Sequence, residues 1–332
     1  MGTPKIELHV HLEGTIRPAT LLDIARRNDE PLPSDTIEGL TELYEFRDFA
    51  RFIEVWILTT NCLRTADDFR QVVVDYAAQA AAFGAVYLEA IFSPNERVAR
   101  GVSWDEIFSG YADGGIEAHE RHGVIVRLTP DLYRGLAPEI AEQCATVAVR
   151  YRDRGVVGLG LGGMETGHPA APYGRAFDIA RDGGLGIVPH GGEADGAQAI
   201  RELLAFAPAR LRHGIRAVDD AEVLAEIVDS GIVLDVCPTS NLRTGVVPSL
   251  AEHPLPALRQ AGALCTINTD DPAMFGTDLA REFAIAAQLG VSAEQAYAAG
   301  LVGALCDDTT RAALGALWPA AAISAGAIGE GL

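Results

Sequence analysis

Three histidines and one aspartate, widely separated in the chain, form a donor set that suits a divalent metal ion. His9 and His11 lie two residues apart in an apolar run, so a strand there turns both imidazoles to one face. His190 and Asp270 each end another short run. Three imidazoles with one carboxylate suit Zn2+, with water completing the site, although Fe2+ or Mn2+ accepts the same donors. We expect one such ion per chain, while a buried, hydrogen-bonded pair explains His9 and His11 alone equally well.

Two further titratable residues lie at the ends of neighbouring runs without an evident structural task. Glu193 follows His190 by three residues, and His213 ends another run. A bound divalent ion lowers the pKa of a water ligand from 15.7 to about 7, and groups of this kind then transfer protons. The simpler interpretation is that Glu193 is a surface glutamate and His213 a polar core histidine. That interpretation is less convincing when a complete set of metal ligands lies nearby. We therefore predict that Glu193 and His213 take part in proton transfer.

The elements that position these residues follow from the hydrophobic pattern. Eight short runs end in Gly, Pro, His or Asp and alternate with longer Ala- and Leu-rich amphipathic stretches. Eight βα units predict an α/β fold, a (β/α)8 TIM barrel, with an open doubly wound sheet as the alternative. In a barrel the carboxyl ends of all strands meet at one mouth, which brings the candidate residues together. The runs span residues 6–12, 86–92, 124–128, 156–161, 185–190, 210–213, 232–236 and 263–267.

The whole chain, residues 1–332, is expected to form a single domain. The connection at about residues 13–80 is too long for a simple crossover and carries aromatic helical patterns, which predicts a helical lid over the site. After a last helix that closes near Trp318, an Ala- and Gly-rich stretch at about residues 319–332 is expected to be a loose tail.

Composition excludes several classes of function. With 46 acidic and 26 basic side chains the net charge is −20, which repels nucleic acids and anionic lipid surfaces. Lys5 is the single lysine, which argues against Schiff-base and P-loop chemistry. Five cysteines without a CxxC pair indicate a reducing cytoplasm, and neither a signal peptide nor a membrane span is expected.

Two other patterns receive simpler interpretations. Residues 158–163 satisfy GxGxxG, but no regular helix begins after them, so dinucleotide binding is disfavoured. We interpret these glycines as small residues that let a flat ligand approach the backbone. His253 precedes Pro254 and is interpreted as a loop residue.

Six motifs, in order along the chain, resemble the adenosine deaminase-like branch of the metal-dependent amidohydrolases. The resemblance extends from Lys5 to about Phe283, most of the chain. Six ordered motifs make a chance match very improbable. They are residues 7–14 (ELHVHLEG), 87–94 (YLEAIFSP), 190–193 (HGGE), 212–214 (RHG), 236–242 (VCPTSNL) and 266–272 (TINTDDP).

The resemblance implies a role for each candidate residue. The three histidines and Asp270 bind the metal, and the activated water attacks C6 of a 6-aminopurine with loss of ammonia. Glu193 exchanges a proton with purine N1, while His213 orients the attacking water. Asp271 contacts N7, and the backbone of Gly163 contacts N3.

The resemblance is weaker at the residues that would determine the substrate within this class. Adenosine enzymes often carry Asp at the position of Glu13, where it reaches the ribose, and Arg at the position of Ile91. Residues 162–169 are also closer to relatives that act on adenine or 6-aminodeoxyfutalosine. An adenosine-type substrate is the first expectation, and these two compounds are the alternatives. We also keep a metal-dependent hydrolase of a cyclic amide or ester, and a purine-binding module.

Overall fold

The computed structural model describes residues 3–45, 49–321 and 324 of the chain. Each expected run overlaps a strand, and β3 continues five residues further than expected, to Tyr133. The run at 185–190 becomes two short strands that flank Val188 and Pro189, because proline has no N–H to donate to a sheet. The strands are β1 (Lys5–His11), β2 (Ala85–Phe92), β3 (Ile125–Tyr133), β4 (Gly158–Gly162), β5 (Gly186–Ile187), β6 (His190–Gly191), β7 (Arg210–His213), β8 (Val233–Val236) and β9 (Cys265–Ile267).

The described strands form two parallel sheets that join into one ring. Their orders are β1-β2-β3-β4-β5 and β6-β7-β8-β9, and β5 and β6 are consecutive pieces of the same strand. The ring is completed by a parallel bridge between Val10 and Asp270, where the His11 N–H donates to the Asp270 carbonyl at 2.8 Å. With β5 and β6 counted together, this is the expected (β/α)8 barrel and not an open sheet.

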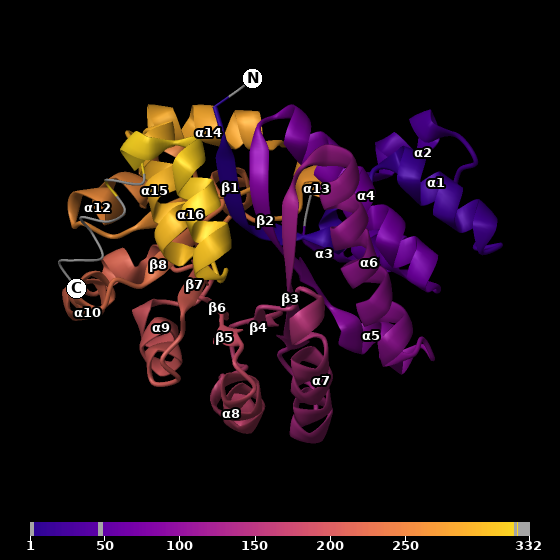
Figure 1. Cartoon of the computed structure of the whole chain (residues 1–332), viewed down its shortest axis with the longest axis horizontal. Coiled ribbons are helices and arrows are strands. Elements are labelled where there is room, and N and C mark those ends of the chain that lie inside the picture. Colours follow the sequence, from indigo (N-terminus) through magenta and orange to yellow (C-terminus); the bar gives the residue numbers. More distant parts are fainter. Residues whose placement is uncertain (1–2, 46–48, 322–323, 325–332) are drawn as a thin grey trace.

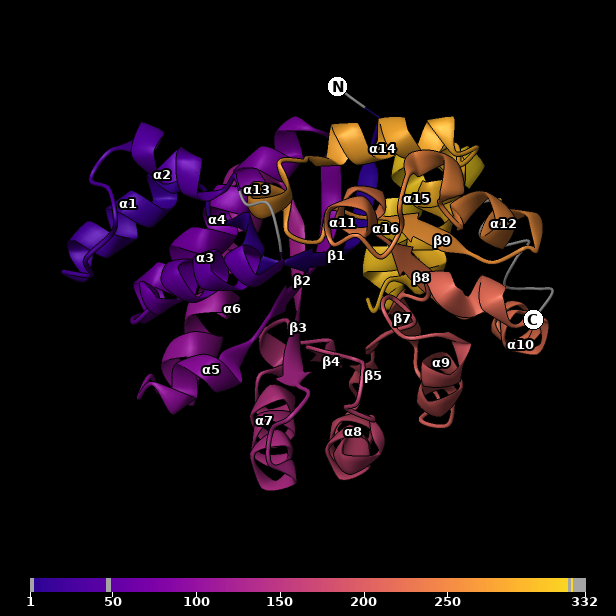
Figure 2. The ribbon, with the colours of Figure 1, turned by 180° about the vertical axis from the view of Figure 1, so that it is seen from behind.

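The helices surround the strands (Figure 1). Helix α4 packs on α6 and β2, while α15 packs against β1 and β9. The view from behind shows α10, α12 and α14 covering the last strands (Figure 2). The α-helices are α1 (Pro18–Arg27), α2 (Ile37–Leu43), α3 (Phe49–Asn61), α4 (Ala66–Ala82), α5 (Pro94–Ala99), α6 (Trp104–His122), α7 (Pro138–Arg150), α8 (Gly174–Asp182), α9 (Ala197–Leu204), α10 (Ala221–Asp229), α11 (Pro238–Arg243), α12 (Leu255–Gln260), α13 (Pro272–Phe275), α14 (Leu279–Gln288), α15 (Ala293–Gly303) and α16 (Asp308–Leu317).

The long connection between β1 and β2 contains α1 to α4. Trp56 of α3 lies with its ring centroid 6.1 Å from that of His11, and Phe52 of the same helix stacks on Phe275. Helix α3 therefore lies beside the end of β1 that carries the histidines. Residues 46–48 of this connection fall outside the described residues, as does most of the stretch expected to be a tail.

Charged side chains are buried inside the barrel below the mouth. Arg210 lies 2.8 Å from Glu89 and 3.0 Å from Asp235, and all three are fully buried. Arg212 pairs in the same way with Asp131 of β3. Arg210 thereby joins β7 to its neighbour β8 and to β2 across the barrel, and Arg212 joins β7 to β3, so these buried pairs hold strands from both sheets in one arrangement. In the part of the chain described, no helix combines the length and apolar character needed to cross a membrane.

Candidate active site

A β-bulge in β1 precedes the two histidines of the HVH motif. The side-chain oxygen of Asn268 accepts from the N–H groups of both Leu8, at 2.7 Å, and His9, at 3.1 Å. The pairing of β1 with β2 shifts register over the same residues, between Glu7 and Val10. Two consecutive N–H groups that share one acceptor are typical of a bulge, which changes the direction of the side chains that follow. Asn268 therefore connects β9 to the strand that presents His9.

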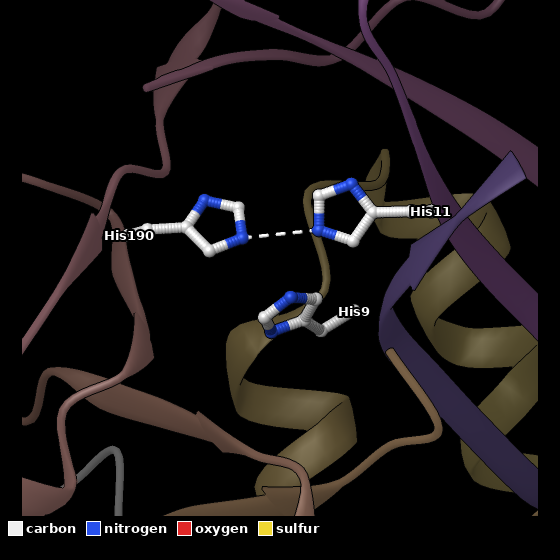
Figure 3. Close-up of side chains that lie close together, drawn as sticks. All are labelled: His9, His11 and His190. Carbon is white, nitrogen blue, oxygen red and sulfur yellow. Dashed lines mark hydrogen bonds between the residues drawn. The ribbon is translucent and has the colours of Figure 1, made fainter. Parts of the chain in front are cut away.

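The three imidazoles converge at the mouth of the barrel (Figure 3). The Nε2 atoms of His11 and His190 are 3.1 Å apart, and Asp270 Oδ1 lies 3.3 Å from Nε2 of both His9 and His11. Four ligands at about 2.0–2.2 Å around one tetrahedral ion would lie about 3.3 Å from one another. These three distances match that spacing, and ligand atoms of His9, His11 and His190 all lie within 4.8 Å of one another.

The protonation of these histidines also suits metal binding. Burial lowers the pKa of His9 to about 3 and that of His11 to about 4, so both are neutral at physiological pH. His9 Nδ1 lies 3.4 Å from the Asp235 carbonyl and His190 Nδ1 lies 3.1 Å from the Leu161 carbonyl, so these ring N–H groups point away from the site. His9 Nε2 is buried and has no hydrogen-bond partner among the described residues. The lone pairs that face the centre are thus free to bind an ion.

An ion pair supports His190 from the side of β3. Asp131 Oδ2 lies 3.2 Å from His190 Nδ1, and Arg212 pairs with the other oxygen of Asp131. A Cβ on Gly160 would collide with both Asp131 and Arg212, and one on Gly162 would lie 2.9 Å from Asp131. These two glycines of the GxGxxG pattern therefore make room for a protein ion pair, which corrects our interpretation of them as a ligand platform.

Two residues of the site hold a backbone conformation that is rare outside glycine. Asp270 has a φ of 64° and His213 a φ of 59°. A left-handed residue other than glycine costs about 1–3 kcal/mol in such positions, and this strain concentrates at functional sites. His213 ends β7 and Asp270 lies three residues after β9, so both strained residues stand where the chain leaves a strand at the mouth.

The loop that carries Glu193 is held by a second carboxylate. Glu165 accepts from the N–H groups of Glu193 at 3.3 Å, Ala194 at 3.2 Å and Asp195 at 2.9 Å. Burial raises the pKa of Glu193 to about 7, and its Oε2 lies 3.6 Å from His213 Nε2. A carboxyl group with this pKa can hold a proton near neutral pH and release it.

Two more carboxyl groups border the site with unsatisfied oxygens. Asp271 Oδ1 and Glu13 Oε2 are buried without a hydrogen-bond partner in the described structure. Burial raises the pKa of Asp271, and it raises the pKa of Glu13 to about 7. A Cβ on Gly14 would lie 2.6 Å from Asp271 Cγ, so glycine is needed there to admit the carboxyl group. Gly163 has a φ of 87°, which leaves its backbone at the end of β4 in a conformation that favours glycine.

A second group of donors, His9, His213 and Cys237, also lies within one ion's reach. Burial raises the pKa of the Cys237 thiol, so it stays protonated, with its sulfur 3.8 Å from the Asp235 carbonyl. A protonated thiol is a poor metal ligand. The first group, with Asp270, is the better metal site.

Comparison with known proteins identifies the family of this chain. The sequence pattern of the family described as "Adenosine deaminase" matches residues 4–315. The chain belongs to the adenosine deaminase family. It is 57% identical over 321 residues to an aminodeoxyfutalosine deaminase of Acidothermus cellulolyticus, which covers 94% of this chain and 90% of that one.

Adenine deaminases are further members of this family that resemble the chain. One from Rhizobium leguminosarum is 37% identical over 93% of this chain and 97% of its own. The crystal structure of adenine deaminase from Arthrobacter aurescens superposes with a TM-score of 0.88 at 31% identity, covering 95% of this chain and 98% of that one. The chain is therefore an adenosine deaminase-like hydrolase of C–N bonds, in a family of metal-dependent enzymes.

The structure brings together six of the predicted site residues, His9, His11, His190, Asp270, Glu193 and His213. Asp271 and Glu13 border this group, and Gly163 lies at the end of β4. The structure also adds residues that sequence reasoning left without a role. Asp131, Glu165 and Asn268 hold His190, the Glu193 loop and β1 through hydrogen bonds and ion pairs. Asp131 lies two residues before the end of β3 and Glu165 three residues after the end of β4, and this closeness to strand ends was the one signal that could have found them.

Proposed function

We propose that this protein is a zinc-dependent hydrolytic deaminase of a 6-aminopurine. The observation that carries the proposal is the convergence of four donors: His11 Nε2 lies 3.1 Å from His190 Nε2, and Asp270 Oδ1 lies 3.3 Å from Nε2 of both His9 and His11. Zn2+ fits this set of three neutral imidazoles and one carboxylate, and Fe2+ or Mn2+ is the alternative. A divalent ion there would lower the pKa of a water ligand to about 7 and so supply the nucleophile for C6.

The surrounding residues would bind and polarise the purine. Glu193, with a pKa raised to about 7 by burial, would hold a proton for N1, which makes C6 more electrophilic. Asp271, kept neutral by burial, would donate its proton to a hydrogen bond with N7. The N–H of Gly163 would face N3, and Glu13 would contact the group on N9. His213 would orient the oxygen that attacks C6.

For the substrate itself we propose 6-aminodeoxyfutalosine. The support is the 57% identity to the aminodeoxyfutalosine deaminase over nearly the whole of both chains. Adenine is the second candidate, supported by the relative at 37% identity and the structure at 31%. An adenosine-type substrate, our first expectation from the motifs, ranks third because Glu13 and Ile91 replace the Asp and Arg of that pattern.

Two functions of other classes make different predictions. A hydrolase of a cyclic amide or ester would form its product without ammonia. Many such sites use two metals bridged by a modified lysine, and Lys5, the single lysine, lies at the opposite end of β1 from the histidines. A purine-binding module would bind without turnover, which the buried proton-transfer groups argue against.

The test is ammonia release by the zinc-loaded protein on 6-aminodeoxyfutalosine, adenine and adenosine. We expect one compound to exceed the others by at least tenfold in kcat/KM, and the His9→Ala variant to be inactive on it. His119→Ala, which removes an exposed histidine of α6, is the matched control and should keep wild-type activity. Product without ammonia, or binding without product in the presence of stoichiometric zinc, would refute the proposal.

A further inference from the structure

A chain of hydrogen bonds lies behind His213, on the side away from the metal ligands. The Leu255 N–H donates to His253 Nδ1 at 3.1 Å, at the start of α12. His253 Nε2 lies 3.3 Å from Asn241 Oδ1, and Asn241 Nδ2 lies 3.3 Å from His213 Nδ1. The three side chains are buried, with exposed fractions of 4% for His253, 0% for Asn241 and 1% for His213. His253 is therefore not the simple loop residue that its neighbour Pro254 suggested.

The backbone N–H of Leu255 decides which atom donates and which accepts in each of these hydrogen bonds. A peptide N–H can only donate, so His253 Nδ1 must accept from Leu255. Burial lowers the pKa of His253 to about 4, so its ring is neutral and its single proton lies on Nε2. That N–H donates to the Asn241 oxygen. The Asn241 amide is thereby oriented with its NH2 group toward His213, where it donates to Nδ1.

The consequence concerns the tautomer of His213. Because Nδ1 accepts a hydrogen bond, the neutral imidazole carries its proton on Nε2. Nε2 is the ring atom that faces the site, 3.6 Å from Glu193 Oε2 and 3.7 Å from Asp270 Oδ2.

We propose that Asn241 and His253 are positioning residues that hold His213 as the Nε2–H tautomer. His213 then acts in the proposed deamination as a hydrogen-bond donor to the attacking oxygen, and its neutral form has no lone pair on Nε2 to act as a base. This inference rests on the proposed function for its catalytic meaning. The tautomer itself is a property of the protein without substrate.

The opposite arrangement, in which each donor along these hydrogen bonds becomes an acceptor, leaves a donor without a partner. A proton on His213 Nδ1 would require the Asn241 amide to rotate, so that its oxygen accepts from His213. Its NH2 group would then face His253 Nε2, and the His253 proton would move to Nδ1. Two N–H groups, those of His253 and Leu255, would then face each other in the interior, which leaves a buried donor unsatisfied.

The first test is a two-bond 1H–15N correlation spectrum of the zinc-loaded full chain with 15N-labelled histidine. The eight histidines keep the spectrum simple, and the His213→Gln variant identifies the signals of His213. We expect a protonated Nε2 and an unprotonated Nδ1. A proton on Nδ1, with or without one on Nε2, overturns the inference. The spectrum is recorded without turnover, so a failure of the tautomer inference can be told apart from a failure of the proposed function.

Two substitutions of His253 separate positioning from folding. Asparagine places an oxygen near the position of Nδ1 and keeps the bond to Leu255, but it does not reach Asn241. Glutamine places an NH2 group near Nε2 and keeps the bond to Asn241. We expect His253→Asn to lower kcat about tenfold or more with KM within threefold, and His253→Gln to keep kcat within threefold. The reverse order, or equal losses in the two variants, would show that His253 only supports the loop.

Discussion

Gly14 offers a sharp test of how closely the site is packed around Asp271. A Cβ added to Gly14 would lie 2.6 Å from Asp271 Cγ and 2.7 Å from its Cα. An ordinary van der Waals contact begins near 3.4 Å, so the Gly14→Ala variant must move the added Cβ and the Asp271 Cα apart by about 0.7 Å. The close contact involves the backbone of Asp271, so rotation of its side chain cannot relieve it.

A displacement of this size should be visible in catalysis. Misplacing a reacting group by about 1 Å can reduce the rate about 100-fold. We therefore expect Gly14→Ala to lower kcat/KM for the deaminated purine about 100-fold, measured by ammonia release. Zinc content by elemental analysis should accompany each assay, because Asp270 precedes Asp271 in the chain and could move with it.

The matched control is Gly196→Ala. Gly196 is exposed, lies just before α9 and has no heavy atom within 4 Å of an added Cβ. Neither Gly14 nor Gly196 has a positive φ, so both accept alanine without backbone strain. Gly196→Ala should stay within threefold of wild type. If Gly14→Ala keeps wild-type kcat/KM with a full zinc complement, Asp271 does not hold the purine in the way we propose.

Three further predictions follow. Glu7 accepts hydrogen bonds from Tyr76 and Thr269, yet burial raises its pKa to about 7. Because this lies above the unfolded value of about 4.3, stability should fall by up to about 3 kcal/mol as pH rises from about 4.5 to 7, and Glu7→Gln should remove that loss in urea unfolding at pH 5 and pH 8. Glu165→Ala leaves three loop N–H groups without their acceptor, so kcat should fall 10- to 100-fold. Unchanged kcat at full zinc occupancy would show that Glu165 does not position the loop of Glu193. Removal of the metal by a chelator should abolish ammonia release and lower the melting temperature. Zn2+ at 100 times its Kd should restore about 2.7 kcal/mol of stability, and a melting temperature independent of zinc would contradict the assigned site.

The barrel could be predicted because its signals are local. Each strand is a short apolar run, and the spacing of His9 and His11 by two residues places both rings on one face. Gly160 and Gly162 show the limit of this reasoning, because what they face is Asp131 on β3 and, for Gly160, also Arg212 on β7. A glycine in the sequence predicts close approach but not the group that approaches.

The supporting residues escaped prediction for a related reason. Asn241 and His253 are separated by 12 residues and meet only because α11 and α12 fold back toward the end of β7. Asn268 accepts from the backbone of β1, some 260 residues earlier in the chain. A sequence shows donors and acceptors, but which of them meet is decided by the closure of the barrel.

The seam between β1 and β9 has a consequence for how the protein is made. His9 stands on the first strand and Asp270 lies three residues after the last, where its bridge to Val10 joins the two ends of the ring. A growing polypeptide on the ribosome therefore holds two donors early but cannot assemble the complete set until the ninth strand has emerged and docked. Closing so long a loop is the slow kind of contact in folding. Capture of the metal by all four residues therefore requires that the barrel has closed, and the nascent chain cannot acquire activity before that closure.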